Sequence, residues 1–296
     1  MTSLAIRNLT KTYPNGVRAL DDVSLELGAG MFGLLGPNGA GKSTLMRTLA
    51  TLQDVDAGSA VLSVDGAPLD LLADKERARR VLGYLPQDFG LSPKARAQDL
   101  LGTFAVLEGL VDRAARRQVV DALLHKVNLW DARRQAVGTF SGGMRRRFGI
   151  AVALLGNPRL IVVDEPTAGL DPAERARFHH LLAELGEDAV VLLSTHIVDD
   201  VLNLCPRMAI LHQGRVRLVG SPDEAREGLR GRLFARTVTR AEQEALDPAL
   251  GVISTRLVAG RLEVRVVADA APAGFHPVEP SLEDVYFAVT TGRWTP

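Results

Sequence analysis

The stretch Gly36-Pro37-Asn38-Gly39-Ala40-Gly41-Lys42-Ser43-Thr44 decides the fold of this chain. It fits the phosphate-binding loop pattern G-x-x-x-x-G-K-[ST] without a mismatch. Residues 31–35 before it are predicted as a short buried strand, and residues 45–50 after it as a helix. A strand, a glycine-rich turn and a helix N-terminus form an anion site, because free backbone N–H groups and the helix dipole both point at the phosphates.

The residue types in this loop suit nucleotide phosphates. The three glycines let the backbone curl and approach closely, where a Cβ would obstruct. Lys42 can reach the β- and γ-phosphates, and the Ser43 hydroxyl can bind Mg²⁺. The alternative is an ordinary glycine turn before a helix, which would not need a Lys-Ser pair at this position.

Composition narrows the class of protein. The 296 residues are 46% hydrophobic and 24% charged, as in a soluble globular protein with one large domain and a smaller one. Lys plus Arg equals Asp plus Glu at 35 each, which gives no sign of a nucleic-acid partner. Cys205 is the only cysteine, so no intrachain disulfide forms and the cytosol is expected. No stretch approaches the roughly 18 to 20 apolar residues of a spanning helix, so a membrane role would need a partner.

Acidic residues end one of the predicted core strands. Residues 160–163 are four apolar residues that predict a central parallel strand, and Asp164 and Glu165 follow. In a chain with a phosphate loop, a carboxylate at such a strand end predicts a Mg²⁺ partner, here Asp164. Glu165 is the candidate base for activating water. Two adjacent buried carboxylates without an ion would be costly, which disfavours a purely structural role.

Polar residues also follow two other predicted strands. Gln87 lies just past the strand at residues 81–86, and His196 just past the buried strand at residues 189–194. Open α/β sheets place ligand groups at these strand ends. A lone His after a strand is usually structural, but its position at the same end of the sheet as Asp164 favours a phosphate contact.

Two turns supply further candidates. Tyr13 lies in a turn between residues 4–9 and 23–27, both predicted as edge strands, and its ring could stack on a base or simply pack. Residues 140–145 form a second glycine-rich turn that opens a helix, and this turn contains Ser141, Gly142 and Gly143.

The remaining pattern predicts two domains. Residues 97–128 are helical by spacing, and the composition shifts near residue 221. Beyond it we expect a strand at 232–238, a helix at 241–250, a hairpin at 252–267 and a last helix capped by Ser281. The predicted division is residues 1–228, with a helical subdomain at about 88–157, followed by a separately packed α+β accessory domain at 229–296.

The order of these motifs resembles the ATP-binding subunit of ABC transporters, over about residues 4–221. The resemblance implies an α/β P-loop NTPase cassette with a RecA-like parallel core sheet, an antiparallel β subdomain at its edge and an α-helical subdomain. Its motifs, in chain order, are Tyr13, the phosphate loop, Gln87, Ser-Gly-Gly at 141–143, Asp164-Glu165, Asp171 and His196.

The resemblance also implies the role of each residue. Tyr13 would stack on adenine, and the loop residues, with Lys42, Ser43 and Thr44, would hold the phosphates and Mg²⁺. Gln87 would sense Mg²⁺ and the attacking water. Asp164 would support Mg²⁺, Glu165 would be the general base, and His196 would contact the γ-phosphate. Asp171 would cross a dimer interface, and Ser141, Gly142 and Gly143 would complete the ATP site of the opposite subunit.

One position departs from the family pattern. The signature usually reads Leu-Ser-Gly-Gly-Gln, whereas this chain has Phe140-Ser141-Gly142-Gly143-Met144. Met144 cannot supply an amide. The run Ser-Gly-Gly-Met-Arg-Arg-Arg, the sequence Ala-Gly-Leu-Asp-Pro and the closing Ser-Leu-Glu-Asp-Val-Tyr-Phe look like the ABC-2 type exporter subfamily.

The resemblance implies an ATPase subunit that uses ATP and Mg²⁺ and dimerises head-to-tail with a second copy or a paralogous subunit. It would drive a separate integral-membrane permease, for export, from the cytoplasmic face of the cell membrane, with no nucleic acid. One alternative is a soluble ABC ATPase that acts on ribosomes or DNA. Such proteins generally carry two cassettes in one chain or a long coiled coil, and neither feature is in this sequence. A regulatory nucleotide-binding module without turnover is a third possibility, which the intact Glu165 disfavours.

Overall fold

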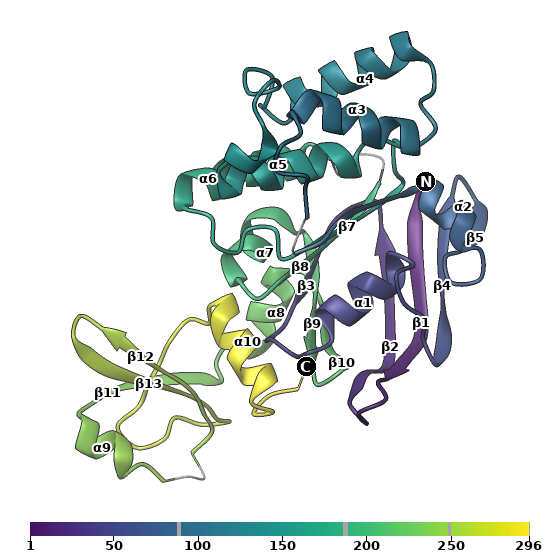
Figure 1. Cartoon of the computed structure of the whole chain (residues 1–296). Helices are drawn as coiled ribbons and strands as arrows, with labels where there is room; N and C mark the ends of the chain where they lie inside the picture. Colours follow the sequence, from purple (N-terminus) through teal and green to yellow (C-terminus); the bar gives the residue numbers. More distant parts are fainter. Residues whose placement is uncertain (88–89, 186–188, 248–249, 296) are drawn as a thin grey trace.

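The computed structural model describes residues 1–87, 90–185, 189–247 and 250–295. A six-stranded sheet forms its centre, with the strand order β10-β9-β3-β8-β7-β6 (Figure 1). Its strands run parallel except β10, which pairs with β9 in antiparallel fashion. The strands are β3 (Gly30–Leu35), β6 (Leu82–Leu85), β7 (Leu160–Asp164), β8 (Val190–Thr195), β9 (Arg207–His212) and β10 (Arg215–Gly220). Every residue of β7 and β8 is buried, as their unbroken apolar runs predicted.

A second, antiparallel sheet lies beside this core, with the order β2-β1-β4-β5. It comprises β1 (Ser3–Thr12), β2 (Arg18–Gly28), β4 (Ala57–Val64) and β5 (Ala67–Asp70). The prediction that residues 4–9 form an edge strand is wrong, because β1 pairs with β2 on one side and with β4 on the other. The alternation in β1 reflects one face turned to the core, which a strand in the middle of a sheet shares with an edge strand.

Helices cover the central sheet and extend to one side of it. They are α1 (Lys42–Leu49), α2 (Lys75–Arg80), α6 (Pro172–Ala183), α7 (Val198–Leu204) and, in the helical subdomain, α3 (Ala97–Leu107), α4 (Arg113–Lys126) and α5 (Gly142–Ala153), with a 3-10 turn at Val137–Thr139. The helical segment predicted at 97–128 is broken after α3. Gly109 adopts a left-handed φ of 90°, and Asp112 caps α4 by accepting from the Ala115 N–H.

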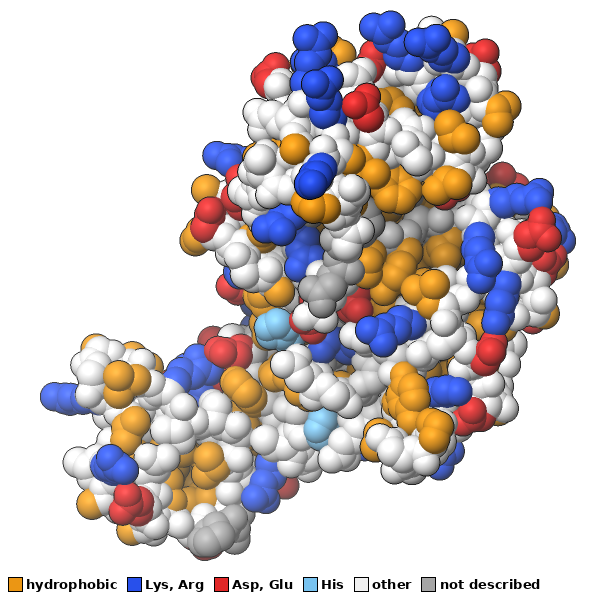
Figure 2. Space-filling view, in the orientation of Figure 1, with side chains coloured by type: hydrophobic (Ala, Val, Ile, Leu, Met, Phe, Trp, Pro, Cys, Tyr) orange, Lys and Arg blue, Asp and Glu red, His pale blue; other side chains and the backbone are white. Residues whose placement is uncertain are grey.

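The helical subdomain is basic. Between residues 90 and 157 the chain has eleven Lys or Arg residues and five Asp or Glu residues, whereas the rest of the chain has 24 and 30. Figure 2 shows Lys and Arg side chains gathered over α3 and α4. The net charge of zero is therefore the sum of a positively charged helical subdomain and a negatively charged remainder of the chain.

The C-terminal part contains α8 (Pro222–Leu229), β11 (Leu233–Val238), α9 (Arg240–Glu244), β12 (Val252–Val258), β13 (Arg261–Val267), β14 (His276–Pro277) and α10 (Leu282–Thr290). Its strands form a sheet in the order β12-β13-β11-β14, with a small core around Phe234, Val264 and Phe275. The helix predicted at 241–250 ends at Glu244, and residues 248–249 of that prediction lie outside the described residues.

The last helix belongs to a different core. Leu282, Val285 and Ala288 of α10 are buried in the same apolar cluster as Leu204 of α7 and Leu229 of α8. Figure 1 shows α10 between the small sheet and the central sheet. The expectation of a separately packed unit needs correction here, because only the sheet has a core of its own. The boundary at residue 229 stays a prediction.

Asp284 attaches the small sheet to α10. Its carboxylate is fully buried and accepts from Ser281 at the helix start, from Arg256 of β12 and from Arg265 of β13. Each arginine has a second carboxylate partner, Glu283 for Arg256 at 3.7 Å and Glu263 for Arg265 at 2.8 Å, so Asp284 is the partner that the two arginines share. No helix in the described ranges is long and apolar enough to cross a bilayer.

Candidate active site

The phosphate loop connects β3 to α1. Gly41 precedes α1 with φ 107°, and no side chain caps the helix, so the first N–H groups of α1 are available to an anion. A Cβ on Gly36 would lie 2.4 Å from the Leu211 carbonyl oxygen, and one on Gly41 would lie 2.3 Å from that of Ala19. Space therefore requires glycine at both positions, and at Gly41 the positive φ requires it as well.

A cavity of about 450 Å³ opens at this loop. Tyr13 lies at its wall, and its hydroxyl is 3.2 Å from both Thr44 Oγ1 and Gln53 Oε1. Gln87 and Glu165 reach the same cavity from two other strand ends. The lining residues are Tyr13, Val17, Ala19, Asn38, Gly39, Gly41, Lys42, Ser43, Thr44, Gln87 and Glu165. The tertiary structure thus gathers the predicted loop with Tyr13, Gln87 and Glu165.

Lys42 is almost completely buried, with 4% of its side chain exposed. Its ammonium donates to the carbonyl oxygens of Gly36, at 2.8 Å, and Pro37, at 3.1 Å. It also lies 3.2 Å from Glu165 Oε1. All three partners are oxygen atoms of the kind that a phosphate group offers, so a bound phosphate can replace them.

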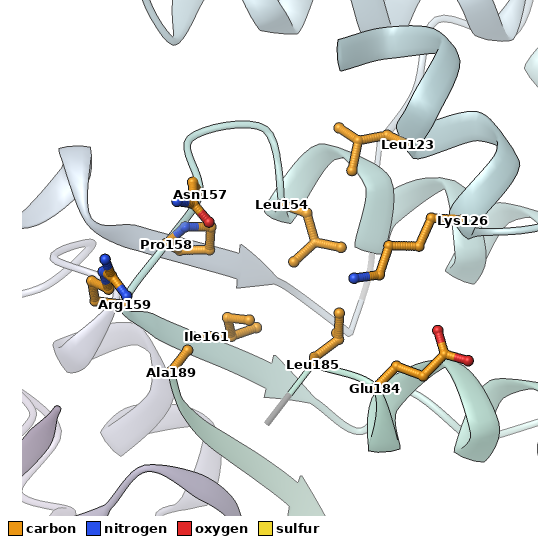
Figure 3. A pocket seen from close by; sticks show the side chains of 10 residues that line it. All are labelled: Leu123, Lys126, Leu154, Asn157, Pro158, Arg159, Ile161, Glu184, Leu185 and Ala189. Atoms are coloured by element: carbon orange, nitrogen blue, oxygen red, sulfur yellow. The ribbon is translucent and has the colours of Figure 1, made fainter. Parts of the chain in front are cut away.

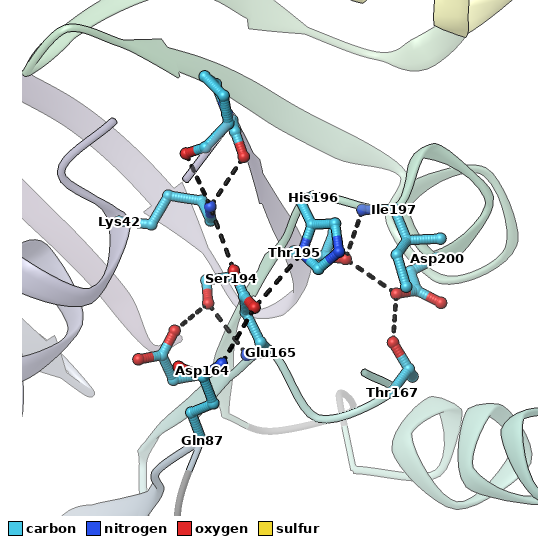
Figure 4. Close-up of polar contacts among 12 residues, drawn as sticks. Lys42, Gln87, Asp164, Glu165, Thr167, Ser194, Thr195, His196, Ile197 and Asp200 are labelled. Atoms are coloured by element: carbon cyan, nitrogen blue, oxygen red, sulfur yellow. Dashed lines mark hydrogen bonds and ion pairs between the residues drawn. The ribbon is translucent and has the colours of Figure 1, made fainter. Parts of the chain in front are cut away.

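The Glu165 carboxylate contacts three of the other predicted site residues (Figure 4). Besides Lys42, its carboxylate lies 3.3 Å from His196 Nδ1 and accepts from Gln87 Nε2 at 3.4 Å. Glu165 adopts a left-handed φ of 46°, unusual for a residue with a side chain. The backbone therefore turns sharply after β7 and directs this carboxylate at residues from three other segments.

Ser194 holds the two carboxylate residues in place. Its hydroxyl donates to Asp164 and accepts from the Glu165 N–H at 3.2 Å. Sequence reasoning missed Ser194, although a hydroxyl at the end of a buried strand was a signal that could have found it. Burial, and then the Asp164 carboxylate, raise the pKa of the neighbouring Tyr84.

Gln87 is positioned from the helical subdomain. Arg146 of α5 donates to the backbone carbonyl of Gln87 and to that of Pro86, at 3.5 Å. This contact joins α5 to the loop that follows β6. Arg146 is a second residue that sequence reasoning did not single out.

The second glycine-rich turn does not contribute to this cavity. Ser141 caps α5 by accepting from the Met144 N–H at 3.1 Å, and Asp171 caps α6 by accepting from the Glu174 N–H at 2.8 Å. Ser141, Gly142 and Asp171 are exposed, whereas Gly143 is buried against Glu174. None of the four is among the described residues that line the loop cavity. Met144 is half-buried and packs on the main core, so its departure from the family pattern has a packing role.

The oxygen donors near the loop suit a magnesium ion. Mg²⁺ is usually held by one or two carboxylates together with substrate phosphates. Asp164, Ser43 and the amide oxygen of Gln87 are such hard donors. The described residues include no group of three or more His, Cys, Asp or Glu side chains arranged to hold a metal ion alone. The donor set therefore fits Mg²⁺ that arrives with a nucleotide.

Another cavity, of about 420 Å³, lies at the opposite edge of the sheet (Figure 3). It is lined by Pro158 and Arg159 before β7 and by Ala189 before β8, with Lys126 and Glu184 on one side. Open α/β sheets bind ligands at the carboxyl ends of their strands, and this cavity is at the amino ends. We therefore assign the active site to the loop cavity.

Comparison with known proteins decides the family. Residues 20–168, half of the chain, match the family model described as ABC transporter. The chain belongs to the ABC transporter family. It is 35% identical over 254 residues to the doxorubicin resistance ATP-binding protein DrrA of Mycobacterium tuberculosis, covering 84% of this chain and 75% of that protein. It is 34% identical over 304 residues to the daunorubicin/doxorubicin resistance ATP-binding protein DrrA of Streptomyces peucetius, covering 95% and 90%.

The chain is also similar to an export-system ATP-binding protein and to a solved ATP-binding cassette. The lipopolysaccharide export system ATP-binding protein LptB of Escherichia coli K12 is 36% identical over 228 residues, covering 76% of this chain and 92% of LptB. Among solved structures, the dimeric ATP-binding cassette MJ0796 in a post-hydrolysis state with ADP and Pi is 27% identical with a TM-score of 0.65. It covers 74% of this chain and 98% of that one. This ABC transporter chain is thus an ATP-binding, ATP-hydrolysing subunit. Subunits of this kind dimerise and work with membrane permeases.

Proposed function

We propose that this chain binds Mg-ATP as a head-to-tail dimer at the cytoplasmic face of the cell membrane, and that hydrolysis drives a separate permease in export. The observation that carries the dimer is the exposed N-terminus of α5. Ser141 and Gly142 present an N–H-rich, positive helix end to solvent, away from the cavity of their own chain. A second subunit, turned head-to-tail, would bring this helix end to the γ-phosphate at the loop.

Within each site the chain's own residues have defined tasks. Lys42 would exchange its contacts with Gly36, Pro37 and Glu165 for phosphate oxygens. Glu165, released from Lys42, would take a proton from the attacking water, while Gln87 and His196 hold its carboxylate in line. Asp164, Ser43 and Gln87 would hold Mg²⁺, which neutralises developing charge on the phosphates. Tyr13 would stack on adenine.

Three observations support coupling to an exporting permease. Arg146 links the helical subdomain to the Gln87 loop, so a push on α5 would reach the site. The basic helical subdomain also suits a position beside the anionic lipids of an inner membrane surface. The relatives' names speak of drug resistance and lipopolysaccharide export, which favours export here.

The dimer is tested by molar mass in solution. We expect Glu165→Gln protein to dimerise with Mg-ATP and to remain monomeric with ADP or no nucleotide. Adding Ser141→Arg should abolish the dimer, whereas Ala122→Arg, at an exposed position of α4, should leave it intact. Light scattering of the full chain distinguishes these cases. A mass that does not respond to nucleotide in the Glu165→Gln protein would exclude the ATP-bridged dimer.

Copurification tests the permease against the soluble alternative. The tagged chain should bring down an integral-membrane protein from detergent-solubilised membranes. Recovery with ribosomes or DNA instead would favour the soluble ABC ATPase.

A further inference from the structure

Asp200, on α7, is a buried carboxylate without an assigned task. Its side chain is fully buried and meets three donors: Thr167 Oγ1 at 2.5 Å, Thr195 Oγ1 at 2.9 Å and His179 Nε2 at 2.9 Å. Asp200 is not among the described residues that line the loop cavity, so its effect on the reaction must pass through these partners.

Two of the donors are next to catalytic candidates. Thr195 ends β8 and directly precedes His196, and Thr167 follows Glu165 by two residues. Thr195 Oγ1 also accepts from the Ile197 N–H at 2.9 Å, so the turn that carries His196 is fixed on both sides (Figure 4). The third donor, His179, comes from α6 and ties that helix to the same carboxylate.

Burying a carboxylate costs free energy unless hydrogen-bond donors surround it. Here the donor Thr167 lies just after β7 and the donor Thr195 ends β8, so their hydrogen bonds to Asp200 hold both strand ends in place. Glu165 holds a left-handed backbone conformation, which persists only where its surroundings determine it. We call the two hydrogen bonds from Thr167 and Thr195 to Asp200 the Asp200 clamp. Thr167 and Thr195 lie within two residues of Glu165 and His196, whose side chains are 3.3 Å apart.

We propose that Asp200 is a positioning residue that sets the placement of Glu165 against His196 through Thr167 and Thr195. This inference rests on the assignment of Glu165 and His196 to the ATPase site. Because Asp200 is remote from the loop, its loss should slow the chemical step and leave ATP binding nearly unchanged.

The test compares Asp200→Asn with Asp199→Asn, the neighbouring exposed carboxylate on the same helix. In the full-length chain, we expect Asp200→Asn to lower kcat by about 10- to 100-fold and to change KM and the Kd for ATP by less than about twofold. Asp199→Asn should match the wild type in all three. An Asp200→Asn protein with wild-type kcat, or with kcat, KM and Kd all equally impaired, would overturn the proposal.

Thr195 provides a second variant pair if Asp200→Asn does not fold. Thr195→Ser keeps the hydroxyl and should retain wild-type kcat, whereas the isosteric Thr195→Val should lose about as much as Asp200→Asn. When Thr195→Val and Asp200→Asn are combined, the losses of kcat should not add, because both substitutions break the same Asp200 clamp. Equal kcat values for Thr195→Ser and Thr195→Val would overturn the proposal. A wild-type chain that does not hydrolyse ATP, or a fully active Glu165→Gln chain, would instead refute the site assignment.

Discussion

Lys42 and Glu165 form an ion pair inside the protein, with Nζ 3.2 Å from Oε1 and side chains that are 4% and 9% exposed. The pair joins the residue expected to hold phosphate to the residue expected to activate water. Each neutralises the other until a nucleotide enters. We expect nucleotide binding and activation of the base to be linked, because phosphate oxygens would compete with Glu165 for the Lys42 ammonium.

Replacing Glu165 tests this link. We expect Glu165→Gln to lower the ATP hydrolysis rate by about 100-fold or more, since the amide cannot accept the proton. ATP affinity should be retained or increased, because Lys42 keeps the carbonyls of Gly36 and Pro37 and no carboxylate competes with phosphate. Single-turnover hydrolysis and equilibrium ATP binding measure the two effects. Asp131→Asn, at an exposed position, is the control. Wild-type turnover in Glu165→Gln would contradict the role of the base.

A glycine pair tests the geometry of the loop. Gly41 and Gly66 both have positive φ, of 107° and 84°, but only Gly41 has a backbone oxygen, of Ala19, within 2.3 Å of an added Cβ. Gly66→Ala should cost about 1–2 kcal/mol of unfolding free energy. Gly41→Ala should cost more and abolish ATP binding, because the loop must move. Denaturant unfolding and nucleotide titration compare them. Equal effects would show that the loop tolerates a side chain.

The C-terminal region should separate into two parts by deletion. Val278 donates to the Leu233 carbonyl at 3.1 Å, so a short Gly-Ser linker can join these residues in place of 234–277. We expect that variant to fold and to keep ATP affinity within about twofold, because no residue of the loop cavity is removed. A chain ending at Gly231 should lose stability, because it also removes α10 and uncovers Leu204 and Leu229. Thermal unfolding and ATP titration report the difference. Equal stability of the two would show that α10 is not needed by the cassette.

The single thiol gives a prediction for pH. Burial, and then the nearby Asp200 carboxylate, raise the pKa of Cys205 to about 12 from an ordinary value of 9.0. The thiol therefore stays protonated in the folded chain while it ionises in the unfolded chain. Its contribution to stability is complete below pH 9 and falls by up to about 1.4 kcal/mol per pH unit above it.

Two measurements check this behaviour. A thiol reagent should label native protein at pH 8 only as fast as it unfolds. Cys205→Ala should remove part of the decline in unfolding free energy between pH 9 and pH 11. Rapid labelling of the native chain would show that the thiol is accessible.

Sequence alone determined the local elements around the phosphate loop. The glycine spacing, the Lys-Ser pair and the apolar runs of β7 and β8 are short-range patterns, and each constrains only a few neighbouring residues. The same patterns predicted that Gln87, Asp164 and His196 follow strands. The order of the motifs then indicated the family, which the comparisons confirmed.

Only the tertiary structure decided which of these residues meet. The contacts of Glu165 with Lys42, Gln87 and His196 join four segments, and their closeness depends on the strand order of the central sheet. The roles of Arg146 and Asp200 were hidden for the same reason, since each acts on a partner at least several residues away, whereas the position of Ser194 at the end of a buried strand was a signal in the sequence. The attachment of α10 to the cassette was equally hidden, because an amphipathic helix shows in its sequence that one face is buried but not against which core.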